Sequence, residues 1–144
     1  MASRSSLALR TSKFTIAEAT WEILAPSTSR PVIRELSVIQ ATATAQTLGL
    51  GRPGAVAGTP TNVLFQRDDP GDPASVVNGQ ITWTTTPTAP TIFLRRWNSA
   101  ATIGVGIVWT WQDDGGLVVA ASAGIVLWNI TTSVACDVNC KIED

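Results

Sequence analysis

Several residue types on which enzymes depend are absent from this chain or rare in it. Its 144 residues include no histidine, no tyrosine, one methionine and two cysteines, and only 15% of them are charged. Histidine is the commonest general base and a frequent metal ligand, and without such a base a serine nucleophile lacks activation. The sequence therefore predicts a protein that is not an enzyme and that holds no metal or other cofactor.

Long apolar runs and a strong net charge are absent as well. The chain has no run of about 18 apolar residues, which a membrane-spanning helix would need. Its net charge of −1 provides no field that would attract nucleic acid or an anionic membrane. Residues 1–13 lack the apolar run of a secretory signal, and two cysteines fit a reducing compartment, so synthesis in a cytoplasm is expected.

Two groups of side chains come nearest to a metal site. Cys136 and Cys140 lie on one face of an alternating stretch, where four residues of strand span about 13 Å, too far for a disulfide or a shared ion. We interpret both as buried, reduced thiols. The aspartates of the turns at 68–73 and 112–116 are alternatives for calcium, but carboxylates in such turns usually cap backbone amides.

Short stretches in which apolar and polar residues alternate recur along the chain. The clearest covers residues 134–142. For residues 15–24 a helix is the competing interpretation, but the Thr, Ile, Trp and Phe residues of that stretch favour strand. Nine or ten strands are expected, over residues 14–16, 21–24, 32–44, 63–67, 80–84, 91–97, 105–111, 117–119, 125–130 and 134–142.

Turn residues separate these stretches. Asn78-Gly79 is the strongest hairpin-turn dipeptide, residues 51–61 are expected to be a surface loop, and the strand at 32–44 is expected to soften into residues 47–50. Many short strands divided by Gly, Pro and Asn turns predict an all-β fold, an antiparallel β-sandwich with jelly-roll connections as the specific expectation.

Residues 1–13 differ from the remainder of the chain. They contain three cations and two leucines but no acid, and such a segment is not expected to fold by itself. We predict an extended N-terminal arm over residues 1–13, held by a partner or a neighbouring copy, and a single β-sandwich domain over residues 14–144 that folds without residues 1–12. The candidate partner-binding residues are Arg4, Leu7, Leu9, Arg10 and Lys13.

The six tryptophans and a pair of arginines have alternative interpretations. Trp109 and Trp111 share one apolar strand face and are assigned to the core. For the other four, the core or a subunit interface is favoured, and an exposed row that stacks on sugars is the alternative. Arg95 and Arg96 adjoin Trp97, as in some nucleic-acid sites. They point to opposite faces of a strand, however, so pairing with a carboxylate at a sheet or subunit edge is favoured, and no nucleic-acid partner is expected.

Three features of the chain are the arm at residues 1–13, the Thr-, Val- and Trp-rich strands through residues 79–111 and the ending GIVLWNITTSVACDVNCKIED. Together they resemble the small decoration, or cement, proteins of tailed-bacteriophage capsids. The resemblance implies a non-catalytic β-domain that sits as a homotrimer on the capsid exterior, with the major capsid protein as partner. The alternatives are a phage tail-fibre or baseplate domain and a free-standing carbohydrate-binding module, both of which would bind glycans through exposed tryptophans.

Overall fold

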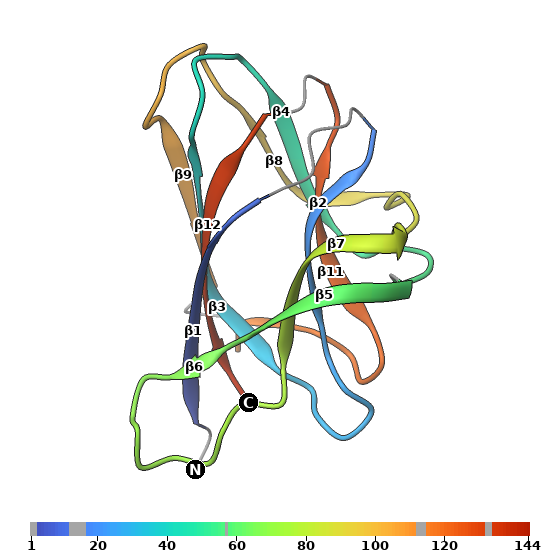
Figure 1. Ribbon diagram of the computed structural model, residues 1–144, viewed down its shortest axis with the longest axis vertical. Coiled ribbons are helices and arrows are strands. Elements are labelled where there is room, and N and C mark those ends of the chain that lie inside the picture. Colours follow the sequence, from blue (N-terminus) through green and yellow to red (C-terminus); the bar gives the residue numbers. More distant parts are fainter. Residues whose placement is uncertain (1–2, 12–16, 57, 112–114, 132–133) are drawn as a thin grey trace.

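The computed structural model describes residues 3–11, 17–56, 58–111, 115–131 and 134–144. These residues contain no helix, and their strands, all paired antiparallel, form two six-stranded sheets (Figure 1). The predicted all-β sandwich is therefore confirmed, whereas jelly-roll connections remain a prediction. The strands are β1 (Arg4–Arg10), β2 (Ala19–Leu24), β3 (Val32–Gln40), β4 (Thr47–Gly51), β5 (Gly58–Leu64), β6 (Gln66–Arg67), β7 (Asn78–Thr85), β8 (Phe93–Asn98), β9 (Gly106–Thr110), β10 (Leu117–Val118), β11 (Gly124–Asn129) and β12 (Cys136–Glu143).

The two sheets meet along both edges of the sandwich. Sheet A has the order β10-β3-β12-β1-β6, with β9 also paired to β3, and sheet B has the order β5-β7-β2-β11-β4-β8. At one edge, β5 continues through Phe65 into β6, so a single stretch of chain passes from sheet B to sheet A (Figure 1). At the other edge, the guanidinium of Arg95 on β8 lies 5.7 Å from the ring centre of Trp111, which follows β9.

The core lies between the sheets and is built by alternation. In β12, residues 136, 138, 140 and 142 are buried and the intervening residues are partly or fully exposed, as the sequence predicts. Trp21 is fully buried and Trp109 is 8% exposed, while Trp111 is half-buried against the same core. Both cysteines are free and buried, which confirms their interpretation as core thiols.

A second, smaller apolar cluster covers the outer face of sheet B. Ile125 and Leu127 of β11 point into the main core, so Val126 and Trp128 point outward, where they pack with Trp83 and Phe93. Trp83 and Trp128 are each only 8% exposed. This second cluster holds two of the six tryptophans, and the other four pack into or against the main core.

Residues 4–10 of the segment predicted as an arm form β1, which lies inside sheet A. β1 pairs with β12 along all seven of its residues, from Arg4 opposite Glu143 to Arg10 opposite Asp137. Ser5 and Ser6 also pair with β6 on the other side. Composition was misleading here, because the polar segment gains its backbone hydrogen bonds and its burial from a strand at the far end of the chain. The expectation of a domain that folds without residues 1–12 does not fit this arrangement.

Other local predictions also need correction. Asn78-Gly79 is not a hairpin turn but the start of β7, between β5 and β2. Gly79 makes room there for Leu7, since a Cβ atom would lie 2.3 Å from Cδ2 of Leu7 and that side chain would have to shift. Residues 47–51 form the separate strand β4, and β5 begins at Gly58, within the expected loop. The candidate strand at 14–16 lies outside the described residues.

Candidate functional site

The structure describes four of the five candidate partner-binding residues and separates them into two groups. Leu7 is buried in the core, at 6% exposure, and Leu9 is half-buried against it. Arg4 and Arg10 point away from the core, with side chains 75% and 62% exposed. Lys13 lies outside the described residues. Of the candidates that the structure describes, the two arginines are therefore the most exposed, and both lie within a strand.

These two arginines belong to a charged surface on the outer side of sheet A. β3, β12 and β1 lie side by side, and their outward positions alternate with the core residues. We call this surface the charged face and define it by Arg4, Arg10, Arg34, Glu35, Asp137, Lys141 and Glu143.

Ion pairs join neighbouring strands across the charged face. Arg10 forms a two-pronged contact with Asp137, Nε to Oδ1 at 2.8 Å and Nη2 to Oδ2 at 2.9 Å. Glu143 accepts from Arg34 Nη2 at 2.6 Å and lies 3.5 Å from Arg4 Nε. A longer contact of 3.9 Å links Lys141 Nζ with Glu35 Oε1.

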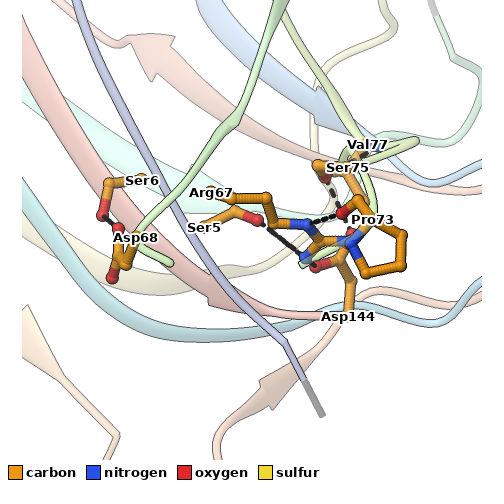
Figure 2. A network of polar contacts seen from close by, with 8 residues as sticks. All are labelled: Ser5, Ser6, Arg67, Asp68, Pro73, Ser75, Val77 and Asp144. Carbon is orange, nitrogen blue, oxygen red and sulfur yellow. Dashed lines mark hydrogen bonds and ion pairs between the residues drawn. The ribbon is translucent and has the colours of Figure 1, made fainter. Parts of the chain in front are cut away.

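A recess of about 460 Å³ lies within the charged face. It is lined by Arg4, Arg34, Glu35, Asp68, Lys141, Ile142 and Glu143. Three cations and three carboxylates therefore surround it, and their formal charges cancel. Ser6 Oγ donates to Asp68 Oδ1 at 2.6 Å, which fixes the carboxylate that comes from outside β1, β3 and β12 (Figure 2).

Two carboxylates of the charged face, Asp137 and Glu143, have a pKa below the ordinary value. The hydrogen bond from Arg34 lowers the pKa of Glu143, and that from Arg10 lowers the pKa of Asp137. A general acid needs a carboxyl whose pKa is raised toward neutrality. These two are displaced in the opposite direction, so the arrangement suits polar recognition of a partner better than proton transfer.

A buried ion pair joins the residues next to two that line the recess: Arg67 precedes Asp68, and Asp144 follows Glu143. The side chains of Arg67 and Asp144 are 11% and 2% exposed, and Arg67 Nη1 donates to Asp144 Oδ1. Arg67 also donates to Ser5 Oγ at 2.9 Å and to the Pro73 carbonyl oxygen, and Ser75 Oγ donates to Asp144 Oδ2 at 2.8 Å (Figure 2). The network ties β1, β6 and the end of β12 to the loop before β7.

Sequence reasoning missed this network, and no local pattern signals it. Its residues come from four separate segments of the chain: Ser5, Arg67, Ser75 and Asp144. These segments come together only where the chain passes from β5 in sheet B to β6 in sheet A. The sole hint is Arg67 itself, a cation at the end of an apolar strand, directly before the turn at 68–73.

The remaining candidates for chemistry lie elsewhere. Burial raises the pKa of both the Cys136 and the Cys140 thiol, which disfavours a reactive thiolate. Among the described residues, no three His, Cys, Asp or Glu side chains gather to hold a metal ion. All six tryptophans are buried or half-buried, so none belongs to a fully exposed row. Arg95 lies over the ring of Trp111, and the predicted pairing of Arg95 or Arg96 with a carboxylate stays a prediction.

In the part of the chain that the structure describes, no helix is long and apolar enough to cross a membrane. Comparisons with protein-family models, with curated proteins and with solved structures found no match.

Proposed function

We propose that this protein is a non-catalytic structural virion protein that binds and stabilises a bacteriophage capsid shell as a decoration protein. It acts on the capsid exterior as a homo-oligomer, with a trimer expected, and its partner is the major capsid protein. The observation that carries the proposal is the charged face, in which balanced ion pairs surround a recess on the closely paired strands β3, β12 and β1.

Ion pairs of this kind suit a docking surface. A solvent-exposed pair contributes only about 0–1 kcal/mol to folding, so exchanging its partner for a charge on the shell costs the domain little. Complementary charges across an interface mainly determine register and exclude wrong partners. Arg4 and Arg10 retain the role of shell contacts under this proposal, but from a fixed strand rather than a flexible arm.

The chemistry of the chain supports a structural role over an enzymatic one. The chain has no histidine, its thiols are buried, and Glu143 at the recess is paired with arginine. The glycan-binding alternatives have less support, because the indoles that would stack on sugars pack into the two apolar clusters.

Co-sedimentation with shells that lack this protein tests the proposal. Reversing two charges at the recess, Arg4→Glu with Lys141→Glu, is expected to weaken shell binding at least about tenfold, since like charges would then face each other across the interface. The matched control is Arg30→Glu with Arg52→Glu, which changes the net charge equally at two exposed arginines outside the charged face.

Two results would contradict the proposal. One is co-sedimentation of the recess variant as tight as that of the unchanged protein. The other is an unchanged protein that ignores shells but is retained on immobilised glycans, which would favour the tail-fibre or carbohydrate-binding alternative.

A further inference from the structure

One edge of the sandwich carries exposed apolar and basic side chains together. We call it the arginine edge and define it by Ile92, Leu94, Arg95 and Arg96, which lie on β8 and directly before it. Ile92 is 76% exposed and Leu94 is 37% exposed. Arg95 and Arg96 are exposed, and they are the only charged residues between Asp72 and Asp113 in the sequence.

The composition of the arginine edge is that of a protein interface. Arginine, aromatic and aliphatic side chains are enriched where two proteins meet. Trp97 and Trp111 lie half-buried at this edge, and Arg95 stacks on the second of them at 5.7 Å. Each of β8 and β9 has one described partner strand, so both present an unpaired side.

The opposite edge has the opposite charge. We call it the acidic edge and define it by Leu64, Asp69, Asp72 and Val76, which lie on β5 and on the loop between β6 and β7. Leu64 and Val76 are each 54% exposed. Arg67 is the only cation of residues 57–77, and its guanidinium is committed to Asp144, so it does not neutralise the two aspartates.

The strand orders place the two edges on opposite sides of the molecule. β8 and β5 are the first and last strands of sheet B, while β9 and β6 lie at opposite ends of sheet A. A surface that matches the arginine edge in apolar character and opposes it in charge therefore exists on every copy of this chain, on the far side.

We infer that the arginine edge binds the acidic edge of a second copy of this chain, head to tail. Because the two surfaces differ, the contact is heterologous, and such contacts form a closed ring when the rotation between neighbouring copies closes. Contact between two arginine edges would oppose like charges, which disfavours a symmetric dimer through this edge. The inference deepens the proposed function, in which the protein is a homo-oligomer, by assigning the surfaces that join its copies.

Side chains, rather than added strand pairing, carry the contact. Pro60 lies in β5 and two arginines lie in β8, and proline and charge are the usual devices that protect edge strands from pairing. A stable interface covers about 800 Å² on each partner. That is roughly a tenth of the 6972 Å² surface of this chain, an area that one edge of the sandwich supplies.

Sedimentation velocity of the purified protein, without any shell, tests the inference. The unchanged protein is expected to sediment as an oligomer that weakens with added salt, since exposed charges are screened. Arg95→Glu with Arg96→Glu, and separately Asp69→Arg with Asp72→Arg, are each expected to raise the dissociation constant at least about tenfold. The variant with all four changes is expected to assemble again, because its charges are exchanged between the edges.

The control variant is Arg30→Glu, at an exposed arginine between β2 and β3, which is expected to assemble like the unchanged protein. Thermal unfolding of every variant shows whether it is folded, and the four-change variant separates a lost contact from a lost fold. A monomeric unchanged protein would overturn the inference, as would an oligomer that either single-edge pair leaves intact or that the four changes fail to restore. Shell binding is not part of this test, so its outcome is independent of the proposed shell contact.

Discussion

Arg67 and Asp144 form an ion pair that is almost shielded from water, with side chains 11% and 2% exposed. Removing charges from water is costly, and the cost is repaid only where the remaining donors and acceptors are also satisfied. Here Ser5, Ser75 and the Pro73 carbonyl provide those partners. The same residues fix the loop that carries the acidic edge, so one buried pair supports both the recess and the proposed contact between copies.

Arg67→Met is expected to lower the free energy of unfolding by about 3 kcal/mol or more, because it leaves the Asp144 carboxylate buried without its cation. Chemical denaturation of the variant measures the loss. The control is Arg30→Met, a change at an exposed arginine that is expected to stay within about 0.5 kcal/mol. Equal stabilities of the two variants would show that the buried pair contributes nothing.

At the scale of elements, β12 organises sheet A because it is paired on both sides, with β3 and with β1. Its alternating sequence predicts its position, whereas β1 has too little apolar character to predict any strand. β1 is a strand because β12 offers it a complete ladder and because the core has a place for Leu7.

Deletion of residues 1–12 is expected to abolish cooperative unfolding rather than leave a folded domain. The deletion exposes one side of β12 and removes Leu7, and a buried leucine alone is worth about 2–5 kcal/mol of a stability that is typically 5–15 kcal/mol. Circular dichroism during thermal unfolding measures this. A truncated protein with a sharp thermal transition near the melting temperature of the full chain would instead support a domain that folds without residues 1–12.

The ladder between β1 and β12 also predicts a weak dependence of stability on pH. Arg10 lowers the pKa of Asp137, and a carboxyl with a lowered folded-state pKa stabilises the fold above its unfolded pKa, near 4, and loses that contribution as pH falls through the folded value. Both side chains are largely exposed, so solvent screening keeps the effect small.

Melting temperatures measured between pH 7 and pH 2 are therefore expected to fall slightly more steeply below pH 4 for the unchanged protein than for Arg10→Ala. Identical slopes would mean that the pair does not contribute to folding. Arg30→Ala is the matched control, because it removes an equal charge from an exposed position.

At the scale of the whole molecule, the proposals use different surfaces. The charged face lies on the outer side of sheet A, and the contact between copies lies at the two edges. The two functions are thus expected to separate: Arg4→Glu with Lys141→Glu should remain oligomeric while losing shell binding. Sedimentation of that variant alone and with shells measures both properties, and loss of assembly together with shell binding would mean that the surfaces are not independent.

The sequence by itself determined the all-β class, most of the strands and the burial of both cysteines, because those depend on alternation and turn residues that are close together in the chain. It did not determine the strand at residues 4–10, the packing role of Gly79 or the Arg67–Asp144 pair. Each of these depends on a partner at least 50 residues away, such as β12 for β1 or Leu7 for Gly79. Only the tertiary structure, in which the chain passes from β5 in sheet B to β6 in sheet A, decided which charged side chains are buried. It also decided which of them form the charged face and which lie at the two edges.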